Sequence, residues 1–227
     1  MSDTLASTLD DATAQRLRGF GLLGILSILI ILMGNVVLVP GSALLVLLWA
    51  RLSRTPWRKL GFVRPKSWIR TIATGILFGI AFKLLMKAIV MPLLGADPIN
   101  QAYHYLAGNR SAIPMTLYLM IAGAGFGEET LFRGYAFERL TKLFGDSIVA
   151  SVSIVLLTSI GFGLAHYSVQ GLAGTEQATI VGLAFGTIFA ITGRLFMLMI
   201  AHASFDLTAY AIIYWDLETT VAHFFFK

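Results

Sequence analysis

Residues 127–133 place two adjacent carboxylates and an arginine inside a long apolar, glycine-rich stretch. An ionised side chain near the centre of a bilayer costs roughly 2.5–3.5 kcal/mol even on lenient insertion scales, so such charges need partners, water or a protein cavity. If the stretch is helical, Glu129 and Arg133 face each other four residues apart, while Glu128 projects about 100° away from Glu129. The spacing therefore predicts a functional site in which Arg133 holds Glu129 and Glu128 stays free.

Two other apolar stretches carry ionisable side chains. His166 ends one stretch, and His202 and Asp206 lie four residues apart on one face of another. Ionisable residues within spans normally face the interior of the bundle, so we expect these residues to share one polar cavity with Glu128. Each group also has a structural interpretation: an ion pair for Glu129 and Arg133, an interfacial cap for His166, and a hydrogen-bonded pair for His202 and Asp206.

Activation of water is the chemistry that suits these side chains. Cysteine is absent, which removes thiolate nucleophiles, and Ser159 and Ser204 show no sign of activation. Glu128 is the candidate general base, and a neutral His166 can share the water or carry a proton. His202 and Asp206 can orient one another or stabilise a developing oxyanion.

The composition is that of a polytopic membrane protein. The chain has 227 residues, of which 57% are hydrophobic and 13% are charged. Its apolar runs are long enough to cross a hydrocarbon core of about 30 Å as helices. We expect an all-α transmembrane helical bundle of about seven spans (six to eight) with a polar intramembrane cavity. The polar, acidic start of the chain predicts no cleavable signal peptide.

The formal net charge of +5 owes much to one basic segment. Residues 51–70 contain no acidic side chain and carry the basic residues Arg51, Arg54, Arg58, Lys59, Arg64, Lys66 and Arg70. A loop of this kind stays on the cytoplasmic side of a membrane. We therefore expect an integral protein of the plasma membrane with loop 51–70 in the cytoplasm, in contact with the lipid bilayer and with no nucleic-acid partner.

The hydropathy pattern divides the chain into four parts: a polar N-terminal segment (1–18), a transmembrane hairpin or single tilted helix (19–56), a core (57–215) and a short C-terminal tail (216–227). In the hairpin reading, which we favour, two short spans meet near Gly34 and Asn35. The later spans are expected at about residues 69–94, 113–144, 147–166, 178–192 and 195–215.

Two polar features interrupt these spans. A loop containing Gly171, Gly174 and Glu176 is expected between the fifth and sixth spans. Lys83 and Lys87 lie on one face of the third span, and we expect both to snorkel toward the far interface rather than enter a cavity.

Three motifs occur in order on separate apolar stretches: Glu128-Glu129-x-x-x-Arg133, Phe162-x-x-x-His166 and His202-x-x-x-Asp206. Together they resemble the signature of the CPBP intramembrane proteases, the CAAX prenyl protease and bacteriocin-processing (Abi) family. The segment at residues 57–62 is similar to the one that commonly precedes the family's core. The resemblance covers roughly residues 57–212 and implies a membrane-embedded endopeptidase, CAAX-protease-like, of glutamate or metal-dependent type.

The resemblance also implies roles for the motif residues. Glu128 and His166 would activate the attacking water, Glu129 and Arg133 would support them, and His202 with Asp206 would form the oxyanion side. The family usually has asparagine where this chain has Asp206. An ionised carboxylate cannot donate a hydrogen bond to an oxyanion, so we expect Asp206 to orient His202 or to be protonated.

The cofactor requirement has two readings. We favour metal-independent activation of water. The alternative is a divalent metal such as zinc, held by Glu128, His166 and His202 with an open position. The His-Glu-x-x-His helix motif of many zinc proteases is absent from the sequence.

The expected partner is a peptide or membrane-protein substrate, prenylated or not. Two other functions stay open: a proton- or ion-coupled transporter that uses the buried Glu and His residues, and a non-catalytic membrane scaffold. The expected spans also contain a conflict. At 1.5 Å per residue, His202 lies about 12 Å from the inner end of its helix and His166 about 28 Å from the start of its own, although a shared site needs them level.

Overall fold

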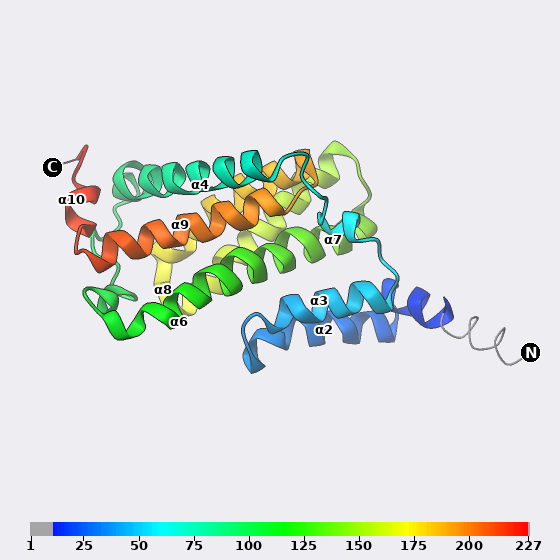
Figure 1. Cartoon of the computed structure of the whole chain (residues 1–227). Helices are drawn as coiled ribbons and strands as arrows, with labels where there is room; N and C mark the ends of the chain where they lie inside the picture. Colours follow the sequence, from blue (N-terminus) through cyan, green and yellow to red (C-terminus); the bar gives the residue numbers. More distant parts are fainter. Residues whose placement is uncertain (1–10, 227) are drawn as a thin grey trace, which may run out of the picture.

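The computed structural model of the chain describes residues 11–226, in which every regular element is a helix (Figure 1). The all-α class is thereby confirmed, and the predictions for residues 1–10 and 227 lie outside the described residues. After a short helix at Asp11–Arg18, the elements in chain order are α2 (Leu22–Val37), α3 (Gly41–Leu52), η1 (Trp57–Leu60), α4 (Trp68–Leu85), η2 (Met86–Val90), α5 (Met91–Leu93), η3 (His104–Leu106), η4 (Arg110–Ala112), α6 (Ile113–Tyr118), η5 (Leu119–Tyr135), α7 (Ala136–Phe144), α8 (Ile148–Thr192), α9 (Phe196–Tyr214) and α10 (Glu218–Ala222).

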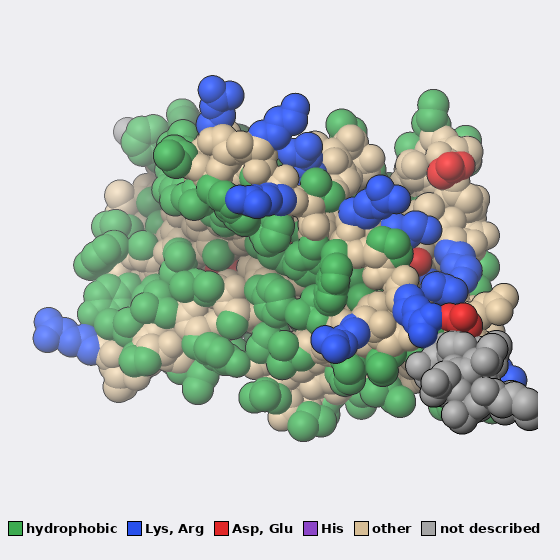
Figure 2. Space-filling view, turned by 45° about the vertical axis from the view of Figure 1, so that its right-hand side comes forward, with side chains coloured by type: hydrophobic (Ala, Val, Ile, Leu, Met, Phe, Trp, Pro, Cys, Tyr) green, Lys and Arg blue, Asp and Glu red, His purple; other side chains and the backbone are tan. Residues whose placement is uncertain are grey.

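Within residues 11–226, three helices are long and apolar enough to cross a membrane: Trp68–Leu93, α8 and α9. A fourth is added if Asp11–Arg18 and α2, which meet at a bend of 63°, form one span. Large hydrophobic side chains are exposed along α2, α4 and α8. Figure 2 shows such side chains over much of one face, with most of its Lys and Arg residues gathered toward the top and right. These helices are consistent with an integral membrane protein, and the total of seven spans stays a prediction.

The N-terminal apolar region forms a hairpin of two helices rather than one tilted helix. Its turn lies at residues 38–40, slightly after the predicted junction at Gly34 and Asn35. Beside the turn, Asn35 N donates to Ser42 Oγ (3.1 Å) and Ser42 N donates to Asn35 Oδ1 (3.0 Å). Gly34 packs directly on the backbone of Ser42, because an added Cβ would meet the Ser42 Cα at 2.7 Å. The close approach explains where the chain reverses.

Helix α8 contains the predicted fifth and sixth spans, joined without the expected polar loop. Its backbone is non-helical at Gly171, with φ 62° and ψ −157°, a combination that is essentially restricted to glycine. The two halves then run antiparallel: a Cβ at Gly182 would lie 2.9 Å from Ser159 Cα, and one at Gly186 would lie 3.4 Å from Val155. The prediction of a loop around Gly171 is therefore wrong, since the polar residues there continue the helices.

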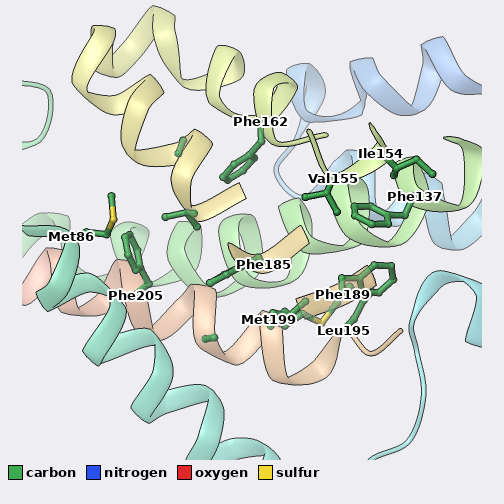
Figure 3. Close-up of a cluster of buried hydrophobic side chains, with 14 of the residues drawn as sticks. Met86, Phe137, Ile154, Val155, Phe162, Phe185, Phe189, Leu195, Met199 and Phe205 are labelled. Atoms are coloured by element: carbon green, nitrogen blue, oxygen red, sulfur yellow. The ribbon is translucent and has the colours of Figure 1, made fainter. Parts of the chain in front are cut away.

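Helix α9 is held by α4 and by the buried core. Gly75 and Gly79 of α4 bring the two backbones together, because an added Cβ at these positions would lie 2.8 Å from side-chain atoms of Ile200 and Ser204. Small residues at such spacing are typical of close helix contacts in membranes. Figure 3 shows the core between α7, α8, α9 and η2, to which Phe162, Phe185 and Phe205 all belong.

The two lysines of the third predicted span do not snorkel. Lys83 is only 6% exposed, and its Nζ donates to Gln177 Oε1 at 3.0 Å. Lys87 donates to the carbonyl of Pro98 and lies 3.6 Å from Glu218 Oε1. The prediction is wrong because both ammonium groups find polar partners inside the protein.

Candidate active site

The charged stretch lies on a continuous helix from Ile113 to Phe144, the range predicted for the fourth span. This helix is not among the three that satisfy the length and hydropathy criteria for a span. Its central part, η5, is wound as a π-helix, a form that is usually short and often found at functional sites. Glycines let η5 approach its neighbours: an added Cβ at Gly125 would lie 2.8 Å from Met199 O, and one at Gly134 would lie 3.0 Å from Leu60 O. The glycine-rich sequence thus brings the carboxylates next to α9.

Glu129 is the buried centre of the cluster, with 0% of the residue exposed. Arg133 Nη1 lies 3.0 Å from Glu129 Oε1, which confirms the predicted i,i+4 pair. The guanidinium carbon of Arg133 also lies 4.6 Å from the ring centroid of Phe162 and 5.6 Å from that of Phe185. Two aromatic faces and a carboxylate therefore fix the arginine, which is 1% exposed.

His202 joins this pair from α9. Its Nδ1 donates to Glu129 Oε1 at 2.8 Å, and both residues are buried. The sequence predicted that His202 and Asp206 could orient one another. In the structure His202 Nε2 lies 3.9 Å from Asp206 Oδ2, beyond hydrogen-bond distance. The firm hydrogen-bond partner of His202 is therefore Glu129, on another helix.

Glu128 faces the other side of the same imidazole. Its Oε2 lies 3.7 Å from His202 Nε2, too far for a direct hydrogen bond. This oxygen is buried and has no hydrogen-bond partner among residues 11–226. A water or substrate oxygen about 2.8 Å from each of the two atoms fits this separation. Glu128 is thus the free carboxylate that the spacing predicted.

A pocket of about 320 Å³ opens beside these groups. Glu128, His166, His202 and Asp206 all line it, so the four residues predicted to share a site are brought together. Glu129 and Arg133 stand behind the lining and contact it through His202 and Phe162. The side chains of Glu128 and Asp206 are each 28% exposed. The arrangement therefore consists of two accessible carboxylates in front of a buried Glu–Arg–His cluster.

His166 reaches the pocket one turn beyond Phe162. Its Nδ1 donates to Phe162 O at 2.8 Å, which leaves Nε2 as the acceptor nitrogen. The ring centroids of Phe162 and His202 are 5.9 Å apart, so these two residues are nearly level. The hydrogen bond of Nδ1 to its own helix agrees with a structural role for that nitrogen. Because His166 also lines the pocket, its Nε2 is available to interact with a water or a substrate.

Most of the height conflict between the two histidines is explained by an offset of their helices. Helix α8 does start at Ile148, and among the described residues its backbone departs from helical geometry only at Gly171. Phe162 lies about 21 Å along α8, whereas His202 lies about 9 Å along α9. Since the two rings are in contact, α8 begins about 12 Å farther from the pocket than α9 does.

Several lining residues were not predicted as site residues. Gln170 Nε2 donates to the hydroxyl of Tyr103 at 3.3 Å, and burial raises the pKa of Tyr103, which keeps the hydroxyl neutral. Lys83 and Gln177 line the same pocket. The sequence signal for these residues was weak. A buried lysine on α4 has the same sequence pattern as one that snorkels to the interface, and the two glutamines resembled loop residues.

The donor set does not fit a metal site by geometry. No three or more of the His, Asp and Glu residues within 11–226 are arranged so that they could hold a metal ion. Glu128 and His202 approach each other, but His166 is offset by about one turn of helix.

Fold and site together define a class: a helical membrane protein with a buried carboxylate–arginine–histidine cluster beside a pocket. Residues 110–208 match the family described as Rce1-like, type II CAAX prenyl endopeptidase Rce1-like. The matched segment contains all three motifs, so the CPBP resemblance is confirmed. No curated protein and no solved structure matches the chain. The family match covers part of the predicted core, and the domain boundaries stay predictions.

Proposed function

We propose that the protein is an intramembrane endopeptidase in which Glu128 activates the attacking water. One observation carries the proposal: the unpartnered, buried Oε2 of Glu128 faces His202 Nε2 at 3.7 Å inside a pocket also lined by His166. An oxygen placed between a carboxylate and an imidazole is positioned for proton transfer. The match of residues 110–208 to an endopeptidase family supports the same reaction.

In the proposed reaction, Glu128 accepts a proton as the water oxygen bonds to the peptide carbonyl carbon. The carbonyl oxygen becomes an oxyanion and is stabilised by the Nε2–H of His202 in its imidazolium form. The carbon–nitrogen bond then breaks while Glu128 returns its proton to the leaving amine. His166, with Nε2 available, assists by accepting a hydrogen bond from the water.

Glu129 and Arg133 act behind the reacting atoms. The Glu129 carboxylate holds Nδ1–H of His202 and so fixes the ring and its charge. Arg133 balances Glu129 and is itself clamped between Phe162 and Phe185. Asp206, 3.9 Å from His202 Nε2, places a carboxylate beside the imidazole on the pocket side and supports its charged form. We assign these three residues to positioning and Glu128 to proton transfer.

The proposal includes a membrane arrangement with seven spans. The reversal at Gly171 divides α8 into two halves, each about 30 Å long at 1.5 Å per residue. With α2, α3, α4, α9 and the helix from Ile113 to Phe144, these make seven crossings. Loop 51–70 then lies in the cytoplasm by the excess of Lys and Arg. In this arrangement the pocket lies within the bilayer of the plasma membrane.

The substrate is a peptide or a membrane protein, prenylated or not, and the reaction is proposed to need no metal. The test uses protein purified in detergent and a panel of labelled peptides with and without a farnesylated cysteine. Wild type is expected to cleave at least one peptide, and Glu128→Gln to cleave none. Glu176→Gln is the matched control, because this glutamate lies outside both pockets. Cleavage by Glu128→Gln at the wild-type rate would contradict the proposal. A wild-type protein that cleaves none of the peptides would also contradict it.

A further inference from the structure

A second pocket of about 460 Å³ adjoins the one that holds Glu128. It extends toward the end of the bundle formed by residues 96–102, the turn of α8 and α10. The two pockets share Lys83, Asn100, Gln170, Gln177, Ala209 and Ile213. A bound peptide can therefore continue from one pocket into the other past these side chains.

Lys83 is the cation at this junction. It is 6% exposed, and its Nζ donates to the neutral Gln177 Oε1 at 3.0 Å and lies 4.8 Å from the ring centroid of Phe205. Within residues 11–226 no carboxylate lies within 4.0 Å of this ammonium group. The nearby acidic groups, Asp206 and Glu218, act on it only at longer range. Its three hydrogens can serve up to three acceptors, of which Gln177 is one.

Lys87, one turn farther along, differs in this respect. It lines the second pocket but lies 3.6 Å from Glu218 Oε1 and donates to the carbonyl of Pro98. Glu218 also accepts from the backbone N–H of Asn100 at 2.7 Å and contacts His104 Nδ1 at 2.9 Å. Lys87 therefore has a carboxylate within 4.0 Å, and Lys83 does not.

We propose that Lys83 binds a carboxylate of the peptide substrate at the junction of the two pockets and so sets which bond lies at Glu128. A buried ammonium group with a neutral partner favours an anionic ligand, and a charge-assisted hydrogen bond is stronger than a neutral one. Glu128 and Asp206 repel a carboxylate from the first pocket, so the peptide's negative group lies on the Lys83 side. This inference rests on the proposed peptidase function and adds a specificity-determining residue to it.

The position of Lys83 agrees with such a role. Figure 3 shows Phe205 beside Met86, on the turn that follows Lys83 along the chain. Phe205 precedes Asp206 and also lines the first pocket. Lys83 is thus held over the ring of Phe205, beside Asp206, and is not itself one of the reacting groups.

Two sources of the carboxylate are distinguished by one peptide in three forms. A labelled apolar peptide that the wild type cleaves is prepared with a free C-terminus, with a C-terminal amide, and as the amide with glutamate in the last position. A higher kcat/KM for the free C-terminus than for both amides identifies the C-terminal carboxylate as the ligand. Equal kcat/KM for the free C-terminus and the glutamate amide shows that a carboxylate from either source at the last position is accepted. Either result supports the inference. Equal kcat/KM for the charged forms and the uncharged amide would overturn it.

The variants separate charge from packing. Lys83→Met is expected to lower kcat/KM for the carboxylate peptide by about 10- to 100-fold, the range of one charge-assisted hydrogen bond, and to leave the amide within about threefold. Lys83→Arg is expected to restore most of the loss. Lys142→Met, whose lysine lies outside both pockets, is the control and should not change the preference. A loss in Lys83→Met that is equal for both peptides would contradict a charge role.

A binding measurement keeps the inference independent of catalysis. Fluorescence anisotropy of the same labelled peptides is recorded with Glu128→Gln protein and with the double variant that also carries Lys83→Met. Tighter binding of the carboxylate form, abolished in the double variant, supports the Lys83 site even if no peptide is cleaved. Equal affinity for acid and amide overturns the site even if the peptidase activity is real.

Discussion

His202 Nδ1 donates a 2.8 Å hydrogen bond to Glu129 Oε1, across 73 residues of sequence and from one helix to another. The bond turns Nε2 of the same ring toward Glu128 and Asp206, at 3.7 and 3.9 Å. One carboxylate thus sets the orientation of the imidazole, and the others face the nitrogen that remains. The site is organised by Glu129 although Glu128 is its reactive member.

Replacing Glu129 with alanine is expected to destabilise the protein, because Arg133 and His202 would lose their buried anionic partner. Removing one member of a buried ion pair typically costs about 3–5 kcal/mol. The thermal unfolding midpoint in detergent should fall by several degrees and peptide cleavage should be lost. Glu176→Ala serves as the control. An unchanged midpoint for Glu129→Ala would contradict the role of Glu129 as the centre of the cluster.

Replacing Asp206 with asparagine introduces the residue that the family usually has. The amide keeps the shape of the side chain and can donate a hydrogen bond toward an oxyanion. We expect kcat/KM to stay within about threefold of wild type or to rise, and Asp206→Leu to lower it by about tenfold or more through loss of the polar group. A loss above about 100-fold in Asp206→Asn would show that the carboxylate itself takes part in proton transfer.

The helices near residues 69–94, 113–144 and 195–215 were predictable, because long apolar runs end at prolines, glycines and polar groups. The Glu129–Arg133 pair was also predictable, since an i,i+4 contact is local. The reversal at Gly171 was not, because Gln170, Glu176 and Gln177 resemble loop residues unless one knows that the two glutamines face a pocket. The bond from His202 to Glu129 joins separate helices, and nothing in the local pattern of either helix specifies it.

Gly171 offers a test of the reversal in α8. An added Cβ there would meet no heavy atom within 4 Å, so alanine affects only the backbone, held at φ 62° and ψ −157°. Gly171→Ala should cost about 1–3 kcal/mol, the strain of a non-glycine residue in that region. Gly161→Ala is the matched control, because it has open space and helical backbone. The unfolding midpoint of Gly161→Ala should equal or exceed that of wild type. Equal midpoints for Gly171→Ala and Gly161→Ala would contradict the reversal.

Chelation tests the proposal that water activation needs no metal. Within the described residues the donor groups are not arranged as a metal site, so dialysis against EDTA followed by 1,10-phenanthroline is expected to leave the cleavage rate unchanged. Activity that is lost and then restored by added zinc would instead favour the alternative in which Glu128, His166 and His202 bind a metal.

The central claim is that Glu128 transfers the proton. The most direct measurement is the single-turnover rate of peptide cleavage by Glu128→Gln, compared with wild type and Glu176→Gln at equal amounts of folded protein. General acid–base catalysis contributes about 10²- to 10⁴-fold, so the rate is expected to fall by at least about 10²-fold with an unchanged unfolding midpoint. A rate within about threefold of wild type would contradict the account.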